Sequence, residues 1–371
     1  MGQLLVTLFL SPVTLVGLLV ALFWRSHRFR QERAVFGTSI DRLWTNWWAG
    51  LLGGIAGGLV LSVALVLLGA MLPHPVLLAL IVLNVVALLL AGLGFAPWFV
   101  ALAGLVILLP PWLGPLAKPA GWAAGYAALL AGLWLVNALL LRFMNPAVDV
   151  PKLRPGKRGA RIATYSRRQW YWLPLVLPVA GDWLPAFGWW PQLGIGSVHF
   201  ALVGLPLVIG AALTTKKQLP THATDAWSWQ YLGAGLVALV VAALVYWRPA
   251  AGQMAVFTLA ALGVILGLAN WAATRRGTGL ISQTSAGVRL VAVQPDTPAS
   301  KMGLAAGDIV PTCNHLPVHT EDELYAALQT SPTYCRLKVM RLDGAIRLTE
   351  TAIFNGAPHE LGMITFAEEQ A

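Results

Sequence analysis

The sequence of 371 residues is 57% hydrophobic and only 11% charged. Charged residues make up about a quarter of a soluble globular protein, so this composition excludes that class and indicates a polytopic membrane protein. The formal net charge of +10 does not indicate a nucleic-acid partner: residues 1–279 hold 19 of the 25 Lys and Arg residues, and these lie between apolar segments rather than on one folded surface.

Apolar segments long enough to cross a hydrocarbon layer follow one another over residues 1–276. Those with an unbroken window of roughly 18 or more residues are 3–24, 47–72, 76–95, 97–115, 121–141, 193–213, 229–247 and 253–272. A further run, residues 170–190, is interrupted by Pro174, Pro178 and Pro185. We therefore predict an α-helical polytopic membrane bundle of about nine spans, in which the proline-broken run either crosses once or is re-entrant.

The connections between these segments carry clusters of Lys and Arg, which are enriched in the cytoplasmic loops of membrane proteins. The clusters lie in residues 25–42, 142–168, 216–217 and 275–276. Placing all four on the cytoplasmic side requires one, four, two and two crossings in turn, with an external N-terminus. We expect residues 142–168 to touch anionic lipid headgroups of the bilayer, with docking of a partner protein as the alternative.

Few residues within the apolar segments could carry chemistry. Asp182, beside a Trp- and Pro-rich turn, is expected at the membrane interface, and the alternative is an ion or proton site of a transporter or secretion component. Ser197 and His199 would point to different faces of a helix, which argues against the nucleophile and base of an intramembrane protease. Single asparagines are predicted to form hydrogen bonds between helices: Asn84, Asn137 and Asn270.

The sequence predicts no enzyme, metal site or cofactor. A membrane zinc protease would need an H-E-x-x-H motif, and the nearest string, residues 359–363, has Met363 in place of the second histidine. His315 and His319 are too scattered to form a metal site with it. Cys313 and Cys335, without a secretory signal, indicate reduced thiols rather than a disulfide.

After residue 276 the chain changes from continuous apolar segments to short alternating ones, which predicts a second domain of residues 277–371 after a multi-span membrane domain of residues 1–276. The expected strands are 288–293, 309–313, 335–341, 345–353 and 361–366, and the expected helices are 298–302 and 321–329. This domain is predicted to be a small α+β fold.

Four pieces of this second domain carry a specific resemblance: Thr297-Pro298-Ala299, Met302-Gly303-Leu304, Ala306-Gly307-Asp308-Ile309-Val310 and Leu361-Gly362-Met363-Ile364. In this order they resemble a bacterial PDZ domain whose strands are circularly permuted, because the last piece normally comes first. Asn314-His315 departs from the usual Asn-Gly of that family.

The resemblance implies a peptide-binding groove. Backbone amides of Gly362 and Met363 would hold a peptide carboxylate or carbonyl, and a guest would pair along the last strand as an added strand. The expected peptide-binding residues are Leu361, Gly362, Met363, Ile364, Thr365, Leu324 and Leu328. The alternative is that Leu324 and Leu328 belong only to the core and that residues 361–366 are an ordinary closing strand.

Many apolar segments followed by one terminal PDZ-like domain resemble the MinJ family of cell-division topological determinants. The resemblance implies a non-enzymatic membrane scaffold that recruits partner proteins through a cytoplasmic groove, links a curvature-sensing coiled-coil protein of the DivIVA type to the MinD ATPase, and helps to place the septum. It also implies a bacterial cell-membrane location, enriched at septum and poles. The alternatives are a transporter or secretion component with a regulatory PDZ domain, or an intramembrane protease.

Overall fold

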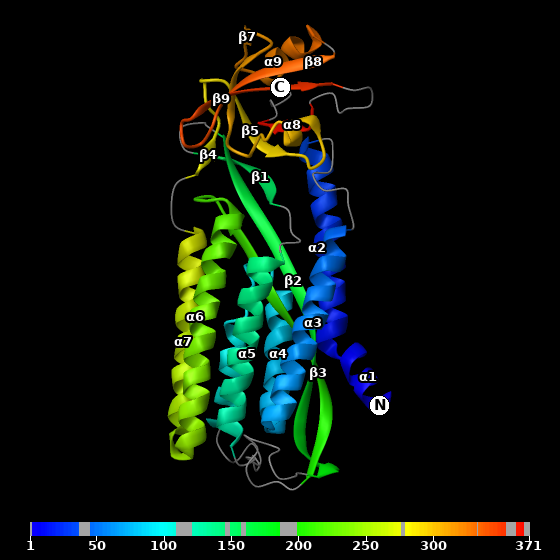
Figure 1. Ribbon diagram of the computed structural model, residues 1–371, viewed down its shortest axis with the longest axis vertical. Coiled ribbons are helices and arrows are strands. Elements are labelled where there is room, and N and C mark those ends of the chain that lie inside the picture. Colours follow the sequence, from blue (N-terminus) through cyan, green and yellow to red (C-terminus); the bar gives the residue numbers. More distant parts are fainter. Residues whose placement is uncertain are drawn as a thin grey trace.

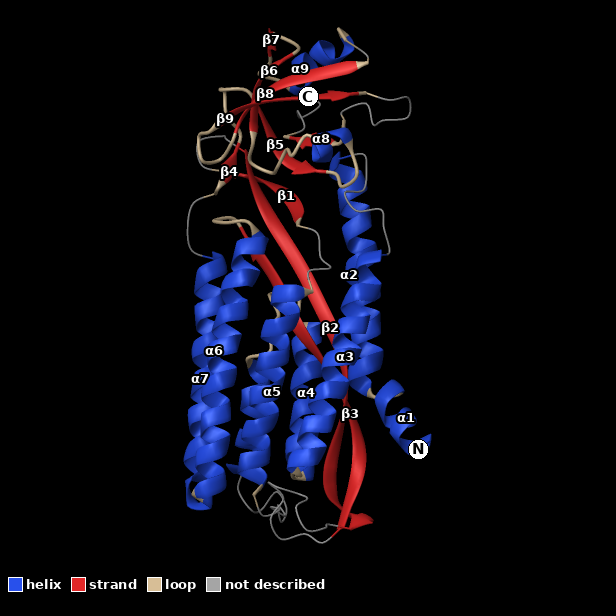
Figure 2. Cartoon of the chain, viewed as in Figure 1, coloured by secondary structure: helices blue, strands red, loops and turns tan. Residues whose placement is uncertain are grey.

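A bundle of helices forms one end of the elongated computed structural model, and a strand-rich region forms the other (Figures 1 and 2). The structure describes residues 2–36, 45–108, 121–144, 149–156, 161–185, 199–275, 279–331, 333–353 and 361–366. The helices of the bundle are α1 (Gly2–Phe9), α2 (Pro12–Phe36), α3 (Thr45–Leu68), α4 (His74–Leu89), the 3-10 helix η1 (Phe99–Leu108), α5 (Trp122–Phe143), α6 (Pro220–Trp247), the short η4 (Pro249–Ala251) and α7 (Gly252–Arg275).

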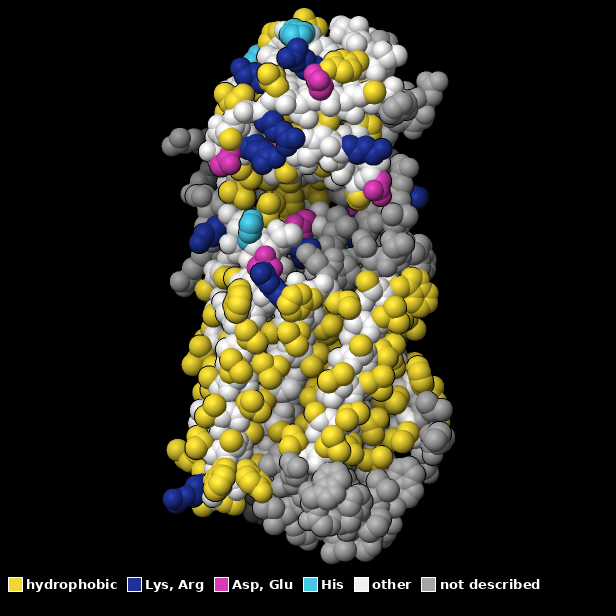
Figure 3. Space-filling view, viewed as in Figure 1, with side chains coloured by type: hydrophobic (Ala, Val, Ile, Leu, Met, Phe, Trp, Pro, Cys, Tyr) yellow, Lys and Arg dark blue, Asp and Glu magenta, His cyan; other side chains and the backbone are white. Residues whose placement is uncertain are grey.

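The outside of the bundle suits a membrane. On the face drawn in Figure 3, hydrophobic side chains cover the helices and charged side chains gather toward the strand-rich region. Within the described residues, five helical segments are long and apolar enough to cross a bilayer: Val6–Arg33, Trp48–Leu68, Trp122–Phe143, Pro220–Trp247 and Pro249–Thr274. The apolar helix α4 is shorter than these.

Two segments that the sequence predicts as membrane crossings are strands. β2 (Arg161–Pro185) and β3 (His199–Thr215) form a long antiparallel hairpin that runs from the strand-rich region into the bundle (Figure 2). The helical predictions for residues 170–190 and 193–213 are therefore wrong over their described parts. A strand covered on both faces is apolar at every position, so its sequence lacks the alternation that identifies a half-buried strand.

A hairpin inside an apolar bundle needs partners for the backbone groups at its edges. Helix α3 covers the edge of β2 with Gly54, Gly58 and Ser62, which are four residues apart and share one face. A Cβ at Gly58 would lie 2.8 Å from Cδ of Pro174, so only glycine permits this approach. The Val176 N–H donates to Oγ of Ser62 at 2.9 Å.

Helix α4 serves the edge of β3 in the same way. The Asn84 amide donates to the Val208 carbonyl (2.9 Å) and accepts from the Val208 N–H (3.1 Å). Two further backbone bonds join Phe95 and Ala212, at 2.8 and 2.7 Å. The expectation that Asn84 bonds to another helix is therefore wrong, because its partner is a strand.

The prolines of the hairpin lie at positions whose backbone N–H would not take part in the bonds between β2 and β3. Antiparallel residue pairs alternate between those that bond across the ladder and those whose N–H groups point outward. Val176 and Val208 use outward groups, and the paired prolines Pro174 and Pro206 are each two residues away from one of them, at the same phase of the ladder. Pro178 has this phase too. A residue without an N–H leaves no unpaired donor at such a position.

The basic connections, where described, lie at the end of the bundle that carries the strand-rich region (Figure 1). Arg142, at the end of α5, forms an ion pair with Asp225 of α6 (3.3 Å). The Leu280 N–H donates to the carbonyl of Lys216 (2.8 Å). Since β2 and β3 are antiparallel, the hairpin returns the chain to the same end, as two helices would have done.

The strand-rich region confirms the elements predicted after residue 276. Its elements are β4 (Ile281–Ser282), β5 (Val288–Val293), α8 (Pro298–Lys301), β6 (Ile309–Cys313), β7 (Leu316–Pro317), α9 (Glu321–Gln329), β8 (Tyr334–Met340), β9 (Ile346–Ala352) and β10 (Met363–Thr365). The main sheet has the order β10-β5-β6-β8-β9, with β7 paired to β6. The other sheet has the order β1-β2-β3, where β1 is Val150–Pro155, and β4 pairs with β2.

The two parts of the chain share a core. The hydroxyl of Tyr165, on β2, donates to the Val291 carbonyl of β5 at 2.7 Å. Around this bond, buried side chains from both sides of residue 276 form one apolar cluster: Ala163, Tyr165, Ile281, Val291, Ala292, Ile364 and Phe366. The membrane hairpin therefore serves as the platform on which the C-terminal sheet rests.

Candidate functional site: a groove between α9 and β10

Helix α9 begins where its sequence provides a cap. Oγ1 of Thr320 accepts from the Glu323 N–H (3.2 Å), and Oε2 of Glu323 accepts from the His319 N–H (2.7 Å). These two bonds satisfy free donors at the helix start, and the acidic first turn favours the positive end of the helix dipole. The helix buries Leu324 and Leu328 on its inner side.

Strand β10 begins at a turn that only glycine fits. Gly362 has φ +84°, and a Cβ there would lie 2.3 Å from Oγ1 of Thr297. The turn is held by two backbone bonds: the Gln294 N–H donates to the Gly362 carbonyl (2.9 Å), and the Ala299 N–H donates to the Leu361 carbonyl (3.0 Å). The strand therefore enters the sheet at a fixed position beside β5.

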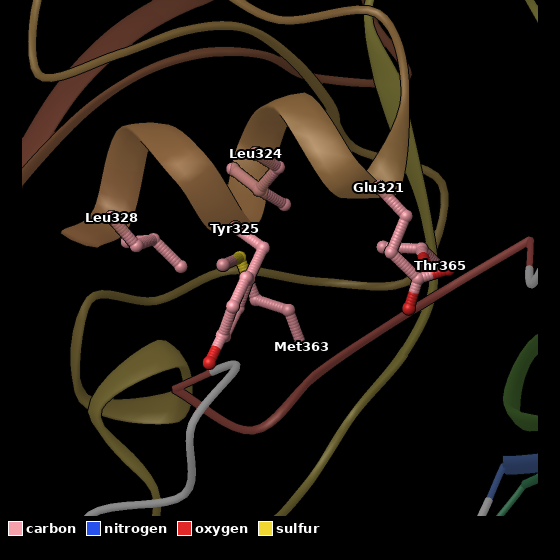
Figure 4. Close-up of a pocket in the computed structure, with 6 residues that line it drawn as sticks. All are labelled: Glu321, Leu324, Tyr325, Leu328, Met363 and Thr365. Atoms are coloured by element: carbon pink, nitrogen blue, oxygen red, sulfur yellow. The ribbon is translucent and has the colours of Figure 1, made fainter.

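A shallow pocket lies between these two elements (Figure 4). It is a shallow apolar depression, and its lining residues are Glu321, Leu324, Tyr325 and Leu328 of α9 and Met363 and Thr365 of β10. β10 is an end strand of its sheet and pairs with β5 on one side. Such an edge, with an apolar pocket beside it, suits an extended peptide that adds itself as a strand.

The structure brings together four of the seven residues that the sequence predicts for this site. Leu324, Leu328, Met363 and Thr365 line the pocket. Leu324, Leu328 and Met363 also belong to the buried core of the C-terminal sheet, as does Leu361, which does not line the pocket. Of the remaining two residues, Gly362 forms the turn and Ile364 faces the hairpin platform. Ile364 points away from the pocket because side chains alternate along a strand.

Two pocket residues were not predicted, although the sequence contains a signal for them. Glu321 and Tyr325 precede Leu324 and Leu328 at the spacing that places four residues on one helix face. Tyr325 is 40% exposed and forms a wall of the pocket. Oγ1 of Thr365 is buried and has no hydrogen-bond partner among the described residues.

The other candidates from the sequence form no second site in the described residues. Asp182 belongs to β2 and His199 begins β3, but their side chains, like all of Ser197, are outside the description. His359 and Glu360 also lie outside it. No group of three or more metal-ligating residues occurs within the described part of the chain. Cys313 and Cys335 are buried and free.

Asn270 and Asn137 differ in their surroundings. The Asn270 amide donates to the Tyr231 hydroxyl at 3.2 Å, which is the predicted bond between helices, here α7 and α6. The Asn137 amide is buried, and neither of its polar atoms has a hydrogen-bond partner within the described residues.

Comparison with known proteins gives the family. No family model and no solved structure matches the chain. The chain is 37% identical over 377 aligned residues to the probable cell division topological determinant MinJ of Lacticaseibacillus paracasei, with 99% of each chain covered. It is 27% identical to the cell division topological determinant MinJ of Bacillus subtilis, covering 98% of this chain and 94% of the relative. The predicted resemblance is thereby confirmed, and the chain belongs to the MinJ family of cell division topological determinants.

Proposed function

We propose that the chain is a non-enzymatic membrane scaffold, and that its C-terminal region is a permuted PDZ-like domain that recruits partner proteins through the groove between α9 and β10. The observation that carries this proposal is the pocket itself, which lies between an edge strand and a helix. The names of the relatives support it, since they describe a determinant of position and no reaction.

A guest segment pairs with β10 as a further strand, so its main chain supplies most of the affinity. One apolar side chain of the guest rests against Tyr325 and Met363, which line the pocket. The carboxylate of Glu321 lies at one end of the pocket and favours a guest with a basic residue there (Figure 4). The amides of Gly362 and Met363 hold a carbonyl or a terminal carboxylate of the guest.

In the cell, the scaffold acts at the division site and poles, where it connects a DivIVA-type protein to a MinD-type ATPase. The groove faces the cytoplasm, because the basic connections gather at the same end of the molecule. The helical bundle fixes the protein in the cell membrane, and the groove brings the partner to it.

A matched pair of tyrosines tests the groove. Tyr325, in the pocket, and Tyr334, on β8, are 40% and 41% exposed, so truncating either side chain removes a similar surface. With the full chain in lipid nanodiscs, we expect Tyr325→Ala to weaken the binding of the purified DivIVA-type or MinD-type protein about tenfold. Tyr334→Ala should leave both affinities unchanged.

Equal affinities for the wild type and Tyr325→Ala, with both partners, would contradict binding through the groove. The location is tested separately by fluorescent fusions with and without residues 280–371. A uniform membrane signal in both cases would contradict a role at the division site.

A further inference from the structure

A cluster of cations lies where α2 meets the sheet of β1 and β2. The guanidinium carbon of Arg168 is 3.8 Å from the centroid of the Trp24 ring, a stacked cation–π contact. The rings of Trp24 and His27, one turn apart on α2, are 5.6 Å apart. This packing fixes the cation of Arg168 beside the end of the apolar part of α2.

The register of the strands adds further cations on the same side. Lys152 of β1 is paired with Thr164 of β2, and side chains alternate along a strand. Lys152, Arg154 and Arg168 therefore lie on one face of the sheet, the face toward α2. His27 is within electrostatic reach of Lys152 and Arg168, and also of Arg30.

Within the part of the chain that the structure describes, these cations form no ion pair, whereas nearby arginines do. Arg142 pairs with Asp225 at 3.3 Å, and Arg167, on the opposite face of β2 from Arg168, pairs with Asp149 at 3.2 Å. In contrast, the buried Nε of Arg168 has no hydrogen-bond partner among the described residues.

Lys152 also carries a cation that its surroundings disfavour. Burial lowers its pKa, and the charges of Arg168 and Arg154 lower it further. An anion placed between these residues would relieve the repulsion.

We propose that His27, Arg30, Lys152 and Arg168 bind the phosphate group of an anionic membrane lipid. The site lies where the apolar part of α2 ends in a tryptophan, the depth at which indole rings and lipid phosphates meet. Guanidinium and ammonium groups are the usual protein partners of phosphate oxygens, and each contributes charge attraction near an anionic surface. A free phosphate ion has the same chemistry, so the test must separate the two sources.

Native mass spectrometry of the full chain, released from a non-ionic detergent, counts the ligands bound to intact protein. We expect wild-type chain to bind phosphatidylglycerol, and the double variant Lys152→Gln/Arg168→Gln to bind it at least about tenfold more weakly. The control Lys216→Gln/Lys217→Gln removes two cations at the same end of the bundle and should stay within about twofold of wild type. Arg168→Lys, which keeps the charge, should recover most of the binding.

Equal affinity of wild type and the double variant for phosphatidylglycerol would overturn the proposal, as would an equal loss in the control. If the double variant folds poorly, Lys152→Gln alone decides, because its side chain stacks on no ring in the described contacts and its loss should still weaken binding severalfold. Phosphatidylcholine, whose phosphate is neutralised by choline, should bind weakly. If inorganic phosphate binds as tightly as phosphatidylglycerol, with the same dependence on Lys152, the lipid assignment is wrong.

Discussion

Gly362 and Gly344 share a backbone φ of 84° but differ in their surroundings. A Cβ at Gly362 would lie 2.3 Å from Oγ1 of Thr297, whereas one at Gly344 would meet no atom within 4 Å. We expect Gly344→Ala to cost about 1–2 kcal/mol for its positive φ alone, and Gly362→Ala to cost at least about 1 kcal/mol more. Thermal melts of the full chain in detergent measure the difference. Equal melting temperatures would mean that Thr297 can move aside and that the turn before β10 is not fixed.

Also at the scale of residues, the sequence predicts which two elements border the pocket better than it predicts which of their residues line it. The PDZ-like pieces locate Met363 and Thr365 because the glycine turn at Gly362 fixes where the strand after it enters the sheet. They also include Ile364, which faces the platform, because local sequence does not say which face of a short strand meets which neighbour. The spacing of Glu321 and Tyr325 with Leu324 was available in the sequence, but their polar character obscured it.

At the scale of elements, short alternating strands are predictable and the membrane hairpin is not. Strands such as Val288–Val293 have one face on the core, so the sequence alternates. β2 and β3 are enclosed by helices and have no such pattern. The sequence did contain two physical hints of strands. Pro174, Pro178 and Pro206 are separated by even numbers of residues, as positions on one side of a strand ladder would be. The glycines of α3, four residues apart, leave room for another backbone to pack closely.

A substitution at Asn84 tests whether the hairpin needs side-chain hydrogen bonds to satisfy the backbone groups at the edge of β3. Asn84→Leu would suit an apolar helix, but it leaves the N–H and C=O of Val208 without partners, so we expect a loss of about 2–4 kcal/mol. Asn270→Leu is the control: it removes one bond, at 3.2 Å, to Tyr231 and should cost about 1 kcal/mol. Unfolding by SDS in mixed micelles, followed by tryptophan fluorescence, compares the two. If Asn84→Leu lost less stability than Asn270→Leu, the role of Asn84 in satisfying the backbone of Val208 at the edge of β3 would be contradicted.

At the scale of the whole molecule, the Lys and Arg clusters predict which ends of the apolar segments lie together, even for the two segments whose predicted helical conformation is wrong. Lys and Arg report on which side a connection stays, and an antiparallel hairpin returns to its starting side just as two helices do. The sequence gives no sign that residues 163–165 and 288–292 share a core, because contacts over such a separation leave no local pattern.

Tyr165 tests the contact between the hairpin and the C-terminal sheet. Tyr165→Phe removes the 2.7 Å bond to the Val291 carbonyl, for which we expect a loss of about 1 kcal/mol and faster amide hydrogen exchange in residues 288–293. Tyr171→Phe, on the same strand, removes bonds to the carbonyls of Leu140 and Met144 in the bundle and should leave that exchange unchanged. Unchanged exchange in Tyr165→Phe would mean that the apolar cluster alone holds the sheet.

Strand β10 has one face toward the groove and the other on the membrane hairpin: Met363 and Thr365 line the pocket, while Ile364 joins the cluster around Tyr165. If a guest binds β10 as we propose and stabilises this strand, it also stabilises the packing of Ile364 against the β2–β3 hairpin. Binding free energies are reciprocal, so a change in the membrane part that weakens this packing then lowers the affinity for the guest by the factor by which the guest strengthens the packing. Binding of a guest at the pocket and packing of the β2–β3 hairpin in the bundle would then be energetically coupled.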